Sequence, residues 1–123
     1  MPPRPEHIRQ ADHNEGVFRR LDSLDIIDWT ITVMFYAALH KVDAYLALQN
    51  IHPTKHYGKN PPGRNQYVKE KLPRDEARNY LRLYNASKRS RYEVGCLEPN
   101  TRVYYEGLFQ NHFIPLNDYF QSV

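Results

Sequence analysis

The stretch FYAALHKVDAYL, residues 35–46, lies in the least polar part of this 123-residue chain and decides its fold. Apolar residues surround it at helical spacing on nearly every side, which predicts a helix over residues 28–49 at the centre of a helical domain. The same stretch carries His40, Lys41 and Asp43. Polar side chains in a central helix need partners, so these residues are the first candidates for a functional site.

Helical spacing recurs along the rest of the chain, whereas alternating strand-like patterns are scarce. Pro and Gly residues exclude a long regular element from residues 50–63, Pro73 separates two helices, and Pro115 should kink the last one because it cannot donate a backbone hydrogen bond. We therefore predict an all-α fold over residues 1–123, an antiparallel four-helix bundle with one extra short helix in a single domain. The expected helices span residues 6–21, 28–49, 64–72, 75–92 and 101–120.

Composition predicts a soluble, cytoplasmic protein. Cys96 is the only cysteine, so no internal disulfide can form, and such usage suits a reducing compartment. The first ten residues contain no apolar run of the kind that a secretory signal needs. The longest uncharged apolar-rich stretch, residues 29–40, is too short to span a bilayer at about 20 residues per crossing. We therefore expect no membrane association.

Positive charge is concentrated in one third of the chain. Residues 1–50 carry five Lys and Arg against seven Asp and Glu, residues 94–123 carry one against three, and residues 51–93 carry eleven against four. This basic segment, residues 51–93, also holds five of the ten tyrosines. Cations contact phosphates and aromatic rings stack on unpaired bases, so the segment favours RNA or a nucleotide as partner over a merely solvated basic face.

The central helix places three polar side chains on one face. Tyr36 lies one turn before His40 and Asp43 three residues after it, whereas Lys41 points to another side. A carboxylate that bonds one imidazole nitrogen would fix its tautomer and leave the other nitrogen free for acid-base work. The alternative is a buried histidine whose bonds only rigidify the core. We expect this face to form the floor of a polar pocket.

The helix over 75–92 carries two kinds of cation. Its expected apolar face includes Ala77, Tyr80, Leu81 and Tyr84 and continues through Lys88 to Arg91, whereas Arg78, Arg82 and Arg89 form an exposed stripe. An inward guanidinium needs an anion, so Arg91 should pair with Asp43 or Glu15, or bind an anionic ligand. Arg64, just after Gly63 at a helix start, is a further candidate for the rim of the pocket.

Other histidines give weaker signals. His7 falls on the inward face expected for the first helix, and His112 lies among apolar residues of the last. His52 and His56 are four residues apart, but Pro53 spoils a helical pair and no Cys or His motif with metal-ligand spacing follows. We therefore predict no metal site and no cofactor.

In their order along the chain these residues resemble the HEPN family of small helical domains. The likeness covers about residues 11–92 and includes the patterns W-x6-Y-x-A-x-H-x-x-D-A-Y-L and S-x-x-x-R-Y. The matching positions are His13, Asn14, Trp29, Tyr36, Ala38, His40, Asp43, Ala44, Tyr45, Leu46, His56, Arg64, Ser87, Arg91 and Tyr92.

The resemblance implies a homodimeric bundle that acts on RNA or nucleotides in defence or toxin-antitoxin systems, with a partner protein such as a nucleotidyltransferase. Members that cut RNA carry an Arg followed, after four to six residues, by a His. This chain lacks that motif, because only three residues separate Arg9 from His13 and no His follows Arg91 before His112. Binding is therefore the favoured function, with candidate ligand-binding residues Tyr36, His40, Asp43, His56, Arg64, Lys88, Arg91 and Tyr92.

Two alternatives of other classes stay open. One is a ribonuclease or hydrolase that uses His40, Asp43 and Arg91 as catalytic residues. The other is a protein-protein interaction module, in which tyrosine-rich faces bury against a partner chain.

Overall fold

The computed structural model describes residues 4–23, 27–53, 63–92 and 101–123, and every regular element in these ranges is helical. The all-α prediction is confirmed for this part of the chain. The elements are α1 (Arg4–Ser23), α2 (Ile27–Leu48), α3 (Arg64–Lys71), α4 (Arg74–Tyr92), α5 (Thr101–Leu108), the π-helical turn η1 (Phe109–Phe113) and α6 (Ile114–Gln121).

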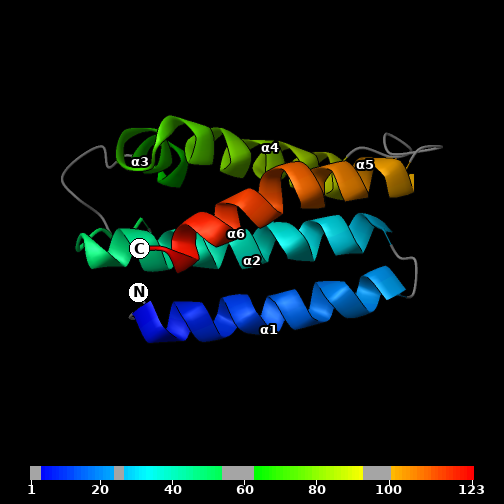
Figure 1. The fold of residues 1–123 in the computed structure, drawn as a ribbon, viewed down its shortest axis with the longest axis horizontal. Coiled ribbons are helices and arrows are strands. Elements are labelled where there is room, and N and C mark those ends of the chain that lie inside the picture. The colour runs from blue at the N-terminus through cyan, green and yellow to red at the C-terminus, as the bar shows by residue number, and fades with distance from the viewer. Residues whose placement is uncertain (1–3, 24–26, 54–62, 93–100) are drawn as a thin grey trace.

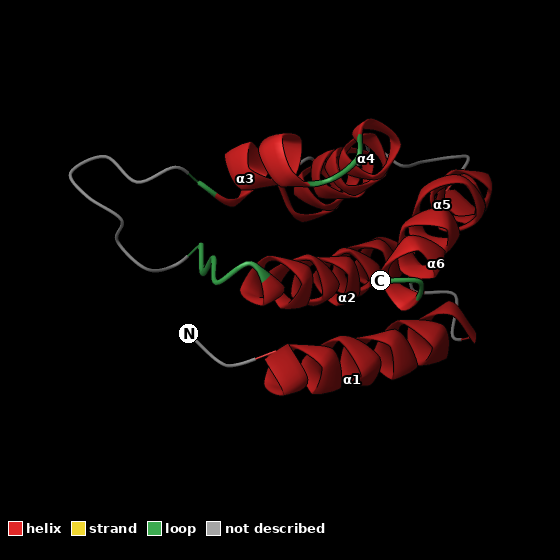
Figure 2. Ribbon diagram, turned by 60° about the vertical axis from the view of Figure 1, so that its left-hand side comes forward, coloured by secondary structure: helices red, strands yellow, loops and turns green. Residues whose placement is uncertain are grey.

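The long elements lie side by side with alternating chain direction. Figure 1 shows α1, α2, α4 and the continuous rod of α5, η1 and α6 as roughly parallel axes, with the short α3 beside the start of α4. Turned by 60°, the molecule shows α2 between α1 and α4, and the α5–α6 rod to one side (Figure 2). Contacts join α2 to α1, α4, α5 and α6, so α2 is the central helix of the fold.

The central position of α2 follows from its sequence. More than half of its 22 residues are buried, on several sides of the helix. By length and composition alone α2 could also cross a membrane, but 56% of its most apolar window is buried inside the fold. The buried core helix of a globular domain can be as long and as apolar as a membrane-spanning helix, so length and composition do not distinguish the two. The absence of membrane association therefore stays a prediction.

An aromatic contact fixes α1 against the last helical rod. Phe18 is fully buried, and its ring meets Phe113 edge-to-face at a centroid distance of 5.2 Å and Phe109 at 6.1 Å. Edge-to-face pairs of this kind contribute about 0.5–1.5 kcal/mol beyond the area they bury. The pair therefore anchors the C-terminal half of α1, while its N-terminal half packs along α2.

The buried face of α4 differs from the predicted one. Leu81 and Tyr84 are only half-buried and Lys88 is exposed, so the prediction that the apolar face continues through Lys88 is wrong. The predicted face and the buried face of α4 both carry apolar residues at helical spacing. The face that packs against the core is the one with smaller side chains toward the C-terminal end of α4. Among the described side chains of α4, the buried ones are Ala77, Tyr80, Leu83, Ala86 and Ser87. The predicted exposure of Arg78, Arg82 and Arg89 is confirmed.

Two prolines shape the elements around α4 and α6. Leu72 ends α3 in an extended conformation, as expected for a residue before Pro73, and the Pro73 carbonyl accepts the first hydrogen bond of α4 from Ala77 at 2.9 Å. Pro115 is the second residue of α6, just after the π-helical turn η1. Because Pro115 cannot donate a backbone hydrogen bond, the helix before it widens into a π-helical turn. The sequence predicted an interruption by Pro115, and the π-helical turn is that interruption.

Candidate functional site

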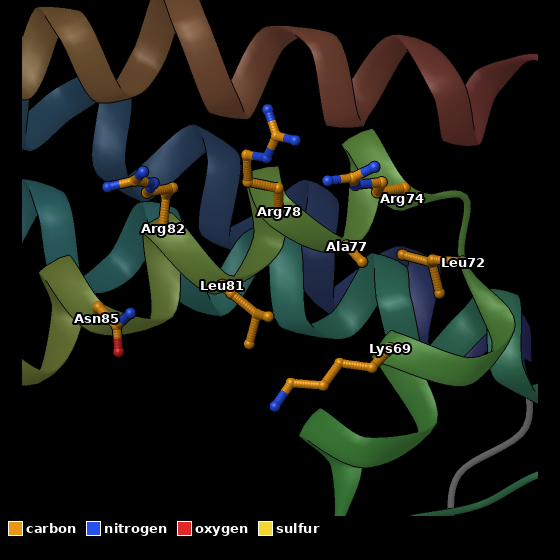
Figure 3. A pocket seen from close by; sticks show the side chains of 8 residues that line it. All are labelled: Lys69, Leu72, Arg74, Ala77, Arg78, Leu81, Arg82 and Asn85. Carbon is orange, nitrogen blue, oxygen red and sulfur yellow. The ribbon is translucent and has the colours of Figure 1, made fainter.

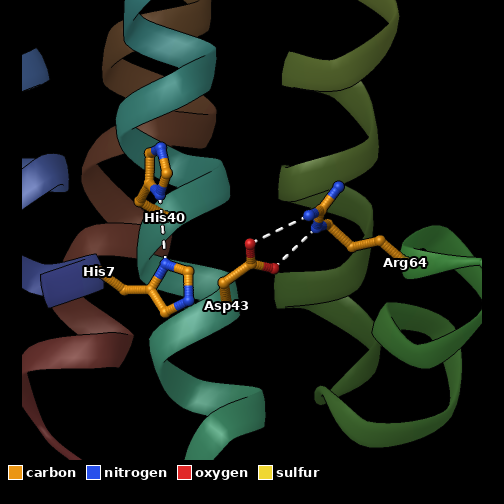
Figure 4. Close-up of polar contacts among 4 residues, drawn as sticks. All are labelled: His7, His40, Asp43 and Arg64. Atoms are coloured by element: carbon orange, nitrogen blue, oxygen red, sulfur yellow. Dashed lines mark hydrogen bonds and ion pairs between the residues drawn. The ribbon is translucent and has the colours of Figure 1, made fainter. Parts of the chain in front are cut away.

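A largely buried ion pair joins α2 to the start of α3. Arg64 donates from Nε to Oδ1 of Asp43 at 2.7 Å and from Nη2 to Oδ2 at 3.0 Å (Figure 4). Asp43 is 2% exposed. Burial lowers the pKa of Arg64, but the hydrogen bond and the charge of Asp43 outweigh it and leave the pKa above its usual value. Arg64 therefore stays charged, and its two hydrogen bonds to Asp43 hold α3 on α2.

The two carboxylates that were expected to pair with Arg91 have other partners. Both oxygens of Asp43 accept hydrogen bonds from Arg64, and Glu15 forms an ion pair at 3.3 Å with Arg19, one turn along α1. The side chain of Arg91 lies outside the described residues, so its pairing stays a prediction. Arg64 was expected at the rim of a polar pocket; its side chain pairs with Asp43 and is 23% exposed, and its place at a pocket rim stays a prediction.

A pair of histidines lies beside the ion pair. The Nδ1 atoms of His40 and His7 are 3.3 Å apart, and the His7 side chain, from α1, is almost fully buried (Figure 4). Burial lowers the pKa of His40; Asp43 opposes this effect, and His7 and Arg64 add to it. His40 is therefore neutral near pH 7, and one imidazole of the pair donates to the other. We expected His40 to bond with Asp43, but its Nδ1 contacts His7 instead.

The ion pair and the histidine pair together form the polar cluster: His7, His40, Asp43 and Arg64. Tyr80 of α4 is buried nearby, and burial raises its pKa well above the usual value, partly against the influence of Arg64. Tyr80 is thus protonated at neutral pH and cannot act there as a base. His7, His40 and Asp43 are the described residues that could together hold a metal ion, since one donor atom of each lies within 4.8 Å of the others.

The remaining predicted ligand-binding residues do not all fall within the described part. Tyr36 is half-buried on α2, and Lys88 is exposed on α4 with its Nζ 5.4 Å from the centroid of the Tyr84 ring. His56 lies outside the described residues, and so do the side chains of Arg91 and Tyr92 at the end of α4. Ligand binding by these residues stays a prediction.

A second candidate site is an open groove of about 480 Å³ between α3 and α4, which we name the basic groove (Figure 3). Three arginines project from α4 at four-residue spacing, about 6 Å apart along the axis, and a lysine of α3 reaches along the other side. The lining residues are Lys69, Leu72, Arg74, Ala77, Arg78, Leu81, Arg82 and Asn85. No carboxylate lines the groove, and none of its four cations forms an ion pair with a described residue.

Sequence reasoning missed part of both sites. The sequence placed His7 on the inward face of α1. Its pairing with His40 depends on how α1 and α2 are aligned, and the residue pattern of a single helix gives no information about that alignment. Sequence reasoning found the exposed stripe that includes Arg78 and Arg82, but not that Lys69 of α3 lines the same groove. The sequence signal for this groove was Pro73, because the break that it makes between α3 and α4 allows the two helices to lie side by side.

No protein-family model, curated protein or solved structure significantly matches this chain. The functional conclusions therefore rest on the basic groove and the polar cluster themselves.

Proposed function

We propose that this chain is a HEPN-like helical bundle that binds RNA or a nucleotide through the basic groove. The observation that carries the proposal is the gathering of four cations, without a neutralising carboxylate, along one open groove. Unpaired cations raise the local positive potential and attract polyanions. Each phosphate that they contact releases condensed counterions, which supplies sequence-independent affinity.

The spacing of the arginines favours a strand over a mononucleotide. Arg74 and Arg82 are eight residues apart in α4, about 12 Å along the helix axis. Such a row reaches more than one phosphate of a polynucleotide. Aliphatic side chains at the groove, such as Leu81, offer apolar contact to sugars and bases. RNA is therefore the ligand that this surface suits better, with a nucleotide occupying part of the same row.

The HEPN resemblance extends the proposal to a homodimer. Sedimentation equilibrium of the intact chain checks this part independently of any ligand, and we expect a mass of twice 14.7 kDa. A monomer at all accessible concentrations would contradict the dimer and leave the groove proposal standing.

The test of binding is the fluorescence anisotropy of a labelled structured RNA titrated with the chain at low and at moderate salt. We expect binding that weakens steeply with salt, because phosphate contacts dominate. Arg78→Glu should weaken it by at least tenfold, since it places a carboxylate inside the basic groove. Arg9→Glu is the matched control, because Arg9 is an equally exposed arginine on α1 and the net charge changes by the same amount.

Running the titrated RNA on a gel separates the alternatives. Intact RNA with salt-sensitive binding supports the proposal. Cleaved RNA would favour the ribonuclease alternative, in which His40→Gln abolishes turnover and leaves binding nearly intact. No binding at either salt would contradict the proposal and favour the protein-protein interaction module.

A further inference from the structure

The polar cluster contains an arrangement that its hydrogen bonds do not fully explain. The Nδ1–Nδ1 contact satisfies one nitrogen of His7 and leaves its other nitrogen, Nε2, buried without a hydrogen-bond partner among the described residues. A buried polar atom without a partner is unfavourable, so native structures rarely keep one without a reason. In Figure 4 this nitrogen lies on the side of the His7 ring that faces Asp43.

The donor atoms have the chemistry and the spacing of a metal site. Two imidazoles and a carboxylate form a ligand set that divalent first-row transition metals accept, with a further position left for water. In a tetrahedral Zn²⁺ site with Zn–N bonds of about 2.0–2.1 Å, neighbouring nitrogens lie roughly 3.3–3.4 Å apart. The two imidazole rings meet through their Nδ1 atoms at 3.3 Å, so they are close enough to bind one ion. Ligation through Nε2 of His7 would give that buried nitrogen a partner.

The third ligand needs only a small adjustment. All three donor atoms lie within 4.8 Å of one another, so Asp43 would approach the histidines by rotation of its side chain. A carboxylate oxygen has more than one lone pair, so Asp43 can keep a hydrogen bond from Arg64 while it binds a cation. Ligating carboxylates are commonly held in this way by an outer partner. Arg64 would then be a positioning residue of the site.

We propose that His7, His40 and Asp43 bind one divalent transition-metal ion, with Zn²⁺ as the best match. The hard cations Mg²⁺ and Ca²⁺ prefer oxygen ligands and should not compete. The site comes from α1 and α2, whereas the basic groove comes from α3 and α4, so the inference does not depend on RNA binding.

The test is a titration of the chelator-stripped, full-length chain with Co²⁺, followed by the visible absorption of the bound ion and by displacement with Zn²⁺. We expect one ion per chain and a rise in thermal midpoint with Zn²⁺ but not with Mg²⁺. His40→Gln and Asp43→Asn should each lower the affinity by at least a hundredfold. His40 is only half-buried, so His40→Gln should fold even where a change at a fully buried ligand does not.

The matched controls are His112→Gln and His13→Gln, which remove a half-buried and an exposed histidine outside the cluster. Both should bind Co²⁺ as the unmodified chain does. The proposal is overturned if the unmodified chain binds no Co²⁺ or Zn²⁺. It is equally overturned if folded His40→Gln, verified by circular dichroism, binds as tightly as the controls, since the metal would then sit on other residues.

Discussion

Arginines of neighbouring elements have opposite environments in this molecule. Arg64, at the start of α3, donates two hydrogen bonds to a buried carboxylate. Arg78 and Arg82, on α4, are exposed and have no ion-pair partner among the described residues. The first arginine stabilises the packing of helices, and the others leave their charge available to a ligand. Residue type alone therefore does not assign function within the basic segment; the position of the nearest carboxylate does.

The largest expected effect concerns the buried pair. Asp43→Asn should lower the free energy of unfolding by about 3 kcal/mol, because Arg64 would keep its charge without an ionised partner. This value lies at the low end for broken buried pairs, since the Arg64 side chain is 23% exposed and water would partly solvate it. Urea denaturation followed by circular dichroism measures the change.

Glu15→Gln is the control for that measurement. It breaks the exposed Glu15–Arg19 pair on α1, which should cost at most about 0.5 kcal/mol. Equal effects of the two substitutions would show that the Asp43–Arg64 pair is no more important to stability than a surface pair.

The second prediction separates two exposed cations of α4. Arg82→Gln should raise the dissociation constant for RNA on the order of fivefold at low salt, because it removes a cation from the basic groove. Lys88→Gln should change it less than twofold, since Lys88 does not line the groove and lies over Tyr84. A larger loss from Lys88→Gln would move the binding surface toward the C-terminal end of α4.

The sequence predicted the helices well because their signals are local. Apolar spacing located α2, and Pro73 and Pro115 marked the interruptions where the structure has them. The face of α4 was less certain, since Leu81 and Tyr84 are as apolar as the residues that are actually buried. Side chains that meet across helices, such as His7 with His40, depend on tertiary alignment, and local periodicity carries no information about it.

The smallest effect is electrostatic and reports on the groove from its edge. His112 bonds through Nδ1 to Asn79, and its pKa is lowered by burial and, to a lesser degree, by the charge of Arg82. Arg82→Gln should therefore raise the pKa of His112, as followed by NMR, whereas Arg9→Gln should not. An unchanged pKa would mean that solvent already screens the groove cations.

The same lowered pKa fixes the sign of one pH effect. Folded His112 binds protons more weakly than unfolded His112, whose ordinary pKa is 6.5, so its contribution to stability is lost as the pH falls through and below 6.5. Urea denaturation at several pH values should show a smaller acid loss for His112→Gln than for the unmodified chain. A steeper loss in the variant would contradict this sign.

The central claim is that the basic groove, rather than the positive charge of the chain as a whole, contacts RNA. It is tested most directly by the salt dependence of the affinity for a single-stranded RNA in two double variants of equal net charge, Arg78→Gln/Arg82→Gln in the groove and Arg9→Gln/Arg19→Gln on α1. We predict that the groove variant reduces the slope of log affinity against log salt by about 1.4, as expected for two lost contacts with single-stranded phosphates. The α1 variant should leave the slope unchanged, and equal slopes in the two variants would contradict the claim.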